Sequence, residues 1–282
     1  MAHDSHIIPV TDFEDLVFDV YARSNEVKLF RHDEPAQGLF IAESVRVILR
    51  ALDAGYAPVS LLLEESAVTG EGAALLERIH NVPVYCAPQS VLEKITGYPV
   101  TRGALCAMRR RTLPSVTDVV EDARRIVVLD HIMNPTNVGA IFRNAAALGV
   151  DAVILCNGCA DPLYRRAVRV SMGNVFLLPW TVSDASYSDA AKDAADAALT
   201  IDLKAMGFSL YALALSDDAI ALHDIAIAKE QKTALFLGSE NDGLSKTILE
   251  SCDHTVMIPM ARGVDSLNVA AASAVAFYAF SQ

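Results

Sequence analysis

Short, nearly continuous apolar runs alternate with helical patterns through the C-terminal half of the chain. Five of these runs predict strands, at 125–132, 151–156, 208–215, 232–238 and 254–259. Unbroken apolar runs are typical of parallel strands that are covered on both faces. Apolar residues at helical spacing predict the helices between them, at 138–148, 162–170, 187–206, 245–252 and 266–280. This alternation predicts right-handed crossovers and ligand binding at the carboxyl ends of the strands.

The N-terminal half shows a smaller alternating pattern. Its predicted strands are 38–43, 59–63, 82–87 and 104–109, and its predicted helices are 11–30, 44–54, 71–80 and 88–96. The sequence Arg-Arg-Arg-Thr-Leu-Pro-Ser at 109–115 is the clearest break in composition. We therefore expect two domains, an N-terminal α/β domain at 1–113 and a larger α/β domain at 114–282.

Composition narrows the classes of protein. The chain has 282 residues, of which 52% are hydrophobic and 21% charged, and this excludes intrinsic disorder. A net charge of −12 argues against a broadly basic nucleic-acid binder. The start lacks a secretory signal pattern, and no apolar run reaches the length of a membrane span. With an odd, sparse count of five cysteines, we expect a reduced cytoplasmic protein without membrane segments.

Polar and glycine residues follow three of the predicted strands. Asn137 and Arg143 come after the first strand of the larger domain, Glu240 lies in a Gly-x-Glu-x-x-Gly loop, and the last strand leads to Ser266 and Asn268. Each loop alone reads as turn chemistry, with Asn137 as a helix cap and Glu240 as a solvated carboxylate. In a parallel sheet all three loops meet at one edge, which favours a ligand site there.

These motifs resemble a known family. Asn-x-Gly-x-x-x-Arg-x-Ala, Gly-x-Glu-x-x-Gly, and Ile-Pro-Met followed by Ser-Leu-Asn-Val-Ala are similar in order and spacing to the motifs of SpoU/TrmH RNA 2′-O-ribose methyltransferases. The resemblance runs from about 125 to 282, and the 38–110 unit resembles a small L30e-like substrate-binding domain. It implies a SPOUT-type parallel sheet with a C-terminal trefoil knot, preceded by that domain. One departure is Arg262, where the family usually has glycine.

The resemblance also implies a chemistry. The cofactor is S-adenosyl-L-methionine, bound in the knot, and its implied contacts are Gly238, Ile258, Met260 and Leu267. The methyl acceptor is a ribose 2′-hydroxyl beside Arg143. Arginine is effectively never deprotonated, so stabilising the developing alkoxide is easier to defend than a role as base. The groups expected to orient the arginine and the substrate are Asn137, Glu240, Ser266 and Asn268. The family works as a homodimer.

An acidic body must contact RNA through local clusters of arginine. The candidates are Arg109, Arg110, Arg111, Arg165, Arg166 and Arg169, although the first three also read as a solubilising linker. The small N-terminal domain favours ribosomal over transfer RNA. The main alternative is a non-catalytic RNA-binding protein that retains the fold. A Rossmann enzyme is disfavoured because no Gly-x-Gly-x-x-Gly follows a predicted strand. Cys156 and Cys159 read as buried thiols rather than metal ligands, and we predict no metal.

Overall fold

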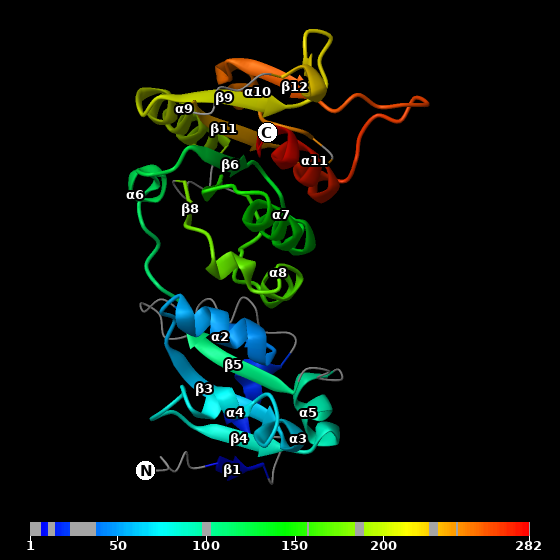
Figure 1. Ribbon diagram of the computed structural model, residues 1–282. Helices are drawn as coiled ribbons and strands as arrows, with labels where there is room; N and C mark the ends of the chain where they lie inside the picture. Colours follow the sequence, from blue (N-terminus) through cyan, green and yellow to red (C-terminus); the bar gives the residue numbers. More distant parts are fainter. Residues whose placement is uncertain are drawn as a thin grey trace. The chain divides into compact units, whose positions relative to one another are not determined.

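The computed structural model describes most of the chain. The described residues are 7–10, 15–22, 38–97, 103–156, 158–183, 189–225, 231–240 and 242–281. They form two units (Figure 1), of which the first comprises Met1–Thr112 with Leu163–Leu177 and the second Leu113–Pro162 with Leu178–Gln282. The main division lies one residue from the expected boundary. The segment Leu163–Leu177, expected in the C-terminal domain, packs within the first unit.

A seven-stranded sheet forms the centre of the second unit, in the order β10-β12-β9-β11-β6-β7-β8. Every neighbouring pair is parallel, which confirms the parallel sheet that the apolar runs predict. The strands are β6 (Arg125–Leu129), β7 (Ala152–Leu155), β8 (Trp180–Val182), β9 (Phe208–Leu213), β10 (Ile220–Ala221), β11 (Lys232–Leu237) and β12 (His254–Met257). The two strands that the sequence did not predict, β8 and β10, lie at the sheet edges.

Helices of the second unit pack on this sheet and on each other (Figure 1). They are α6 (Val116–Val120), α7 (Pro135–Ala147), α9 (Asp189–Ala205), η3 (Leu222–Asp224), α10 (Lys246–Ser251) and α11 (Val269–Ser281). Leu203 of α9 and Ile248 of α10 join one buried core with Phe236 of β11. Burying each such side chain contributes about 1.5–3 kcal/mol. α7 packs against α11. Within the described residues, no helix has both the length and the hydrophobicity needed to cross a membrane.

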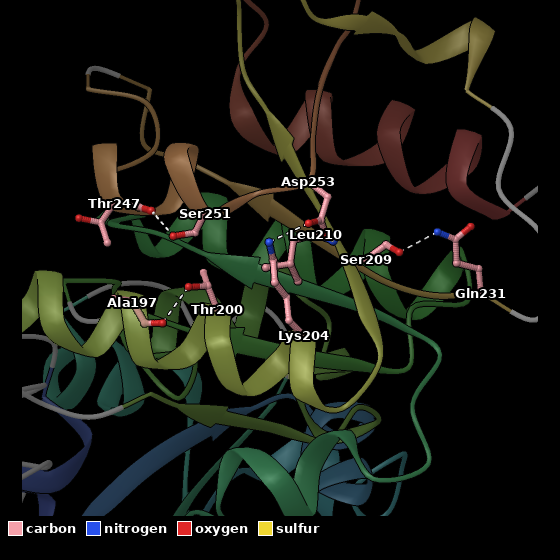
Figure 2. Close-up of polar contacts among 9 residues, drawn as sticks. All are labelled: Ala197, Thr200, Lys204, Ser209, Leu210, Gln231, Thr247, Ser251 and Asp253. Carbon is pink, nitrogen blue, oxygen red and sulfur yellow. Dashed lines mark hydrogen bonds and ion pairs between the residues drawn. The ribbon is translucent and has the colours of Figure 1, made fainter.

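Asp253 fixes the start of β12 beside β9 and α9 (Figure 2). Its Oδ2 accepts a hydrogen bond of 2.8 Å from the Leu210 main-chain N–H, and its Oδ1 pairs with Lys204 Nζ at 2.7 Å. Burial raises the pKa of Asp253, but the Leu210 hydrogen bond and the Lys204 charge outweigh it and hold the pKa below its usual value. The start of β12 is therefore held against β9 and α9.

The first unit has a mixed five-stranded sheet in the order β1-β4-β3-β5-β2, with β5 antiparallel to its neighbours β3 and β2. Its strands are β1 (Ile7–Pro9), β2 (Leu39–Glu43), β3 (Pro58–Glu64), β4 (Val84–Ala87) and β5 (Ala104–Arg109). Its helices are η1 (Leu16–Tyr21), α2 (Val45–Asp53), α3 (Glu65–Val68), α4 (Ala73–Leu76), α5 (Gln89–Thr96), α8 (Arg165–Val170) and η2 (Asn174–Phe176).

Two helix predictions in the first unit need correction. The helix predicted at 71–80 is reduced to α4, because Gly70 and Gly72 at its start favour tight turns. Of the helix predicted at 11–30, the described residues contain only η1, a 3₁₀ helix capped by the Asp15 side chain. The rest of that prediction lies outside the described residues.

Candidate functional site

The three polar loops follow β6, β11 and β12, at the carboxyl edge of one parallel sheet (Figure 1). The first loop ends at Asn134, whose Oδ1 accepts a 2.9 Å hydrogen bond from Thr136 N–H and so caps α7. Pro135 occupies the first helical turn, where its missing N–H costs nothing. The cap is therefore Asn134, and Asn137 lies inside the helix with its side chain available for another role.

Glu240 accepts hydrogen bonds from one asparagine of α7 and one of the loop after β12. Its Oε1 accepts from Asn137 Nδ2 at 2.6 Å and from Asn268 Nδ2 at 2.5 Å. Asn268 Nδ2 also lies 3.2 Å from Asn137 Oδ1. Asn137 is only 5% exposed, whereas Glu240 and Asn268 are exposed, so the carboxylate links a buried amide to the surface through charge-assisted hydrogen bonds. The three motifs are thus physically joined by one carboxylate.

Asn268 also begins helix α11. Its Oδ1 accepts a hydrogen bond of 3.0 Å from the main-chain N–H of Ala270, which makes it a helix cap as well as a donor to Glu240. Asn144 of α7 donates to the Ala270 carbonyl at 2.8 Å and to Ser273 Oγ at 3.0 Å. Helices α7 and α11 are therefore tied together beside the cluster.

A cavity of about 410 Å³ adjoins the cluster, with Glu240 and Ser266 among its lining residues. All four residues expected to contact a cofactor line it: Gly238, Ile258, Met260 and Leu267. Most other lining residues are apolar, which is typical of small-molecule sites with a few orienting polar groups. At Gly238 an added Cβ would lie 2.2 Å from the Gly243 carbonyl carbon. Only glycine lets the loop close on itself here.

Arg143 and Ser266 stand apart from the hydrogen-bonded cluster. Arg143 is exposed on α7, six residues after Asn137, or about 9 Å along the helix axis. Its side chain makes no hydrogen bond or ion pair with any described residue, and the same holds for Ser266. The structure therefore brings together three of the five expected catalytic residues and leaves the arginine directed to solvent. Arg262 has a left-handed φ of 59°, the conformation that glycine adopts without strain.

Sequence reasoning missed a second buried network beneath the loop after β11. Ser245 donates its main-chain N–H to Asp130 Oδ2 at 2.7 Å and its hydroxyl to Asp196 Oδ2 at 3.1 Å. Both carboxylates are 1% exposed. The one signal in the sequence for this network was Asp130, an acidic residue directly after an apolar strand. Burial raises the pKa of the adjacent Cys156 thiol well above its usual value, and the Asp196 and Asp130 charges add to this. The thiol is therefore neutral and inert at pH 7.

The six predicted RNA-binding arginines divide into two groups. Arg109, Arg111, Arg166 and Arg169 are exposed. Arg110 is 8% exposed and donates its Nε–H to the Leu39 carbonyl at 3.1 Å. Arg165 pairs with Glu43 at 3.3 Å, their side chains 11% and 5% exposed, and donates to the Tyr21 carbonyl. The expectation that Arg110 and Arg165 face RNA is corrected, because both guanidinium groups point into the first unit.

Comparison with known proteins shows the family of the chain. Residues 124–278 match the sequence model of the SpoU rRNA Methylase family. An uncharacterized tRNA/rRNA methyltransferase of Mycobacterium bovis is 40% identical over 95% of this chain and 90% of its own length. The 23S rRNA (uridine(2479)-2′-O)-methyltransferase of Streptomyces viridochromogenes is 28% identical over 89% of this chain and 86% of its own. The crystal structure of an AdoMet-bound rRNA methyltransferase from Sinorhizobium meliloti has a TM-score of 0.78 at 25% identity, covering 97% of both chains.

Proposed function

Since the chain belongs to the SpoU rRNA methylase family, we propose that it transfers a methyl group from S-adenosylmethionine to a ribose 2′-hydroxyl of RNA. The observation that carries the proposal is the Asn137–Glu240–Asn268 cluster, which joins all three family motifs at the wall of one cavity. The similarity to a 23S rRNA 2′-O-methyltransferase favours ribosomal over transfer RNA. The trefoil knot and the cytoplasmic location belong to the same proposal.

The cavity residues fit S-adenosylmethionine. The apolar wall of the cavity suits the adenine and the methionine chain of this cofactor. At Gly238 the backbone of Gly243 comes close, and this loop offers main-chain groups for hydrogen bonds. When bound, the sulfonium supplies an electrophilic methyl group. Leu267 and Met260 exclude water on one side, while Glu240 holds the two asparagines that position the incoming ribose.

Arg143 stabilises the negative charge that develops on the ribose 2′-oxygen as this hydroxyl gives up its proton to water and attacks the methyl carbon, whose bond to sulfur breaks to leave a neutral thioether. An exposed guanidinium without a partner among the described residues is available to RNA, and its charge is permanent. This role uses it as a donor rather than as a base. Ser266 lines the cavity, and in this proposal its hydroxyl holds the neighbouring phosphate. Both roles require the bound RNA, which explains why neither side chain has a partner among the described residues.

The protein acts as a homodimer in this proposal. Helix α11 exposes Tyr278 and Val275, 60% and 44% accessible, beside its contact with α7. Large apolar side chains that gather on one exposed helix mark an association surface. RNA contacts come from the exposed arginines of the first unit, Arg109, Arg111, Arg166 and Arg169.

Transfer of tritium from labelled S-adenosylmethionine to RNA from cells that lack the gene tests the proposal. The wild-type chain should label the RNA in alkali-resistant dinucleotides, and Arg143→Ala should reduce the rate at least about a hundredfold. Arg124→Ala is the matched control, because this exposed arginine precedes β6 at the opposite edge of the sheet. Binding of RNA and cofactor without any methyl incorporation would instead support the non-catalytic alternative.

A further inference from the structure

A second cavity lies within the first unit, with a volume of about 490 Å³. It is lined by Ser44 and Arg46 at the start of α2, Glu64 at the end of β3, Ser66 in α3, Gly103 before β5, and Met172 after α8. This volume falls in the range of small-molecule sites. None of the arginines expected to bind RNA lines the cavity, so the proposed function so far gives it no role.

The cavity wall is built from strained but well-fixed backbone. Ser44, Gly103 and Met172 all have left-handed φ values, of 89°, 65° and 55°. This conformation is unfavourable for residues with a Cβ, and it clusters at ligand sites where the surroundings enforce it. Each position is held by a hydrogen bond: Ser44 N–H to the Ala104 carbonyl, Glu64 N–H to the Gly103 carbonyl, and Arg50 Nη1 to the Met172 carbonyl. The wall is therefore formed before any ligand arrives.

Glu64 supplies the carboxylate that faces this cavity. Its side chain is half-buried and does not cap α3, and its carboxylate makes no hydrogen bond or ion pair with any described residue. One carboxylate oxygen lies 3.7 Å from where a Cβ on Gly103 would sit, so the carboxylate rests over the bare glycine backbone. A half-buried carboxylate without a donor among the described residues is costly, and a ligand with donors would relieve that cost.

The two oxygens of a carboxylate match two adjacent donors on a base. Guanine presents N1–H and N2–H side by side, whereas adenine, cytosine and uracil each place an acceptor next to a donor on that edge. We propose that this cavity binds an unstacked guanine of the substrate RNA, with Glu64 accepting its N1–H and N2–H groups. This inference rests on the proposed function, because it supplies the RNA.

The other lining residues complete the recognition. Ser44 Oγ accepts from Val47 N–H, which leaves its own proton free to donate to guanine O6. The thioether of Met172 provides a soft surface for the ring. Arg46 is exposed at the rim and pairs with the attached phosphate. Glu71 is also an exposed lining residue, and its negative charge repels phosphate. The phosphate contact therefore falls to Arg46.

Titration of the full chain with free nucleotides tests the cavity directly. By calorimetry or amide NMR, guanosine monophosphate should bind about tenfold more tightly than inosine monophosphate, which lacks the 2-amino group, and adenosine monophosphate should bind weakest. Glu64→Gln should abolish this ranking because its amide replaces one acceptor with a donor. Glu65→Gln, an exposed neighbour outside the cavity, should preserve it. Equal binding of guanosine and adenosine monophosphate, or an unchanged ranking in Glu64→Gln, would overturn the proposal.

Steady-state methylation separates this inference from the proposed function. With RNA from cells that lack the gene, Glu64→Gln should raise the KM for RNA about tenfold and leave kcat within about twofold. If wild-type protein methylates the RNA and Glu64→Gln leaves KM unchanged, the guanine site is refuted while the methyltransferase stands. If wild-type protein methylates no RNA, the proposed function fails, and the nucleotide titration still decides whether the cavity selects guanine.

Discussion

Asn268 has two tasks that a single substitution can separate. Its Oδ1 caps α11 through Ala270 N–H, and its Nδ2 donates to Glu240. The change Asn268→Asp keeps the capping oxygen and replaces the donor with a second carboxylate facing Glu240. We expect methyl transfer to fall at least about tenfold, because the substitution removes the donor to Glu240 and sets two like charges at contact distance. The measurement is the tritium assay, with circular dichroism to confirm the helix.

The matched control is the same substitution at another helix cap. Asn134 is exposed, caps α7 through Thr136 N–H, and makes no hydrogen bond to Glu240. Asn134→Asp should therefore retain activity and strengthen the cap slightly, since a carboxylate is favourable at a helix N-terminus. Equal activity of the Asn268→Asp and wild-type proteins would show that the cluster does not matter for the reaction.

Cys252 is predicted to resist alkylation in the folded protein. Burial, assisted by the Asp253 carboxylate and opposed by Lys204, raises the pKa of its thiol to about 12. At pH 8 its thiolate population is about a thousandfold below that of an ordinary thiol, and only the thiolate reacts. Mass spectrometry after iodoacetamide treatment should show Cys252 labelled in urea but not in buffer. Labelling at the same rate in both would contradict the raised pKa of this half-buried thiol.

The same raised pKa gives a sign for the pH dependence of stability. A thiol whose pKa is higher in the folded state contributes its full stabilisation of the fold at pH values below its unfolded pKa, near 9. That contribution is lost as the pH rises towards 12. Burial also raises the pKa of the Cys106 and Cys156 thiols. The free energy of unfolding should therefore decline above about pH 9, which thermal melts at increasing pH can measure.

At the scale of elements, apolar runs predicted the five interior strands of the second unit because burial on both faces leaves a long unbroken signal. Strands β8 and β10 have three and two residues, too few to register as a pattern.

The direction of the Arg165 side chain also could not be predicted from a local pattern. Its spacing to Arg169 predicts a shared helix face, but its direction is set by Glu43, a residue 122 positions away that no local pattern connects to it. Long-range pairing of this kind is invisible in a single sequence.

Helix α10 provides a prediction at this scale, through the Ser245 hydroxyl. It accepts from Ile248 N–H at 3.4 Å and donates to the buried Asp196 carboxylate. Ser245→Ala removes the cap and one donor to a desolvated charge, which should cost about 2 kcal/mol and lower Tm by about 4–8 °C. Because Ser245 ends the loop that lines the cofactor cavity, the KM for S-adenosylmethionine should also rise.

Ser251 of the same helix is the control (Figure 2). Its hydroxyl donates to the Thr247 carbonyl at 2.7 Å, a bond within one helical turn that already has its main-chain ladder. Ser251→Ala should therefore change Tm by no more than about 2 °C and leave the cofactor KM unaltered. If thermal denaturation gives equal losses for the two alanine variants, the Asp130–Ser245–Asp196 network has no special part in holding the loop.

At the scale of the whole molecule, the proposed dimer depends on α11. Tyr278→Glu places a charge on its exposed apolar face and should convert a dimer into monomers with little methyl transfer, because a desolvated charge opposes association. Light scattering after size exclusion measures the mass. Ile201→Glu on α9, where the isoleucine is 65% exposed, is the control and should remain dimeric. A monomeric wild-type protein would refute the dimer itself.

Charge sets how this acidic chain can hold RNA. The net charge of −12 leaves only local contacts, and four of the six candidate arginines are exposed, all in the first unit: Arg109, Arg111, Arg166 and Arg169. Each phosphate neutralised contributes about −0.7 to −0.9 to the slope of log K against log salt, so four contacts predict a slope of about −3. Filter binding between 50 and 300 mM KCl, roughly a sixfold range of ionic strength, measures it. Arg166→Gln should reduce the slope by about one, whereas Arg165→Gln, which removes an internal ion pair, should lower Tm and leave the slope unchanged. A slope near −10 would require a broad basic surface that this sequence does not contain.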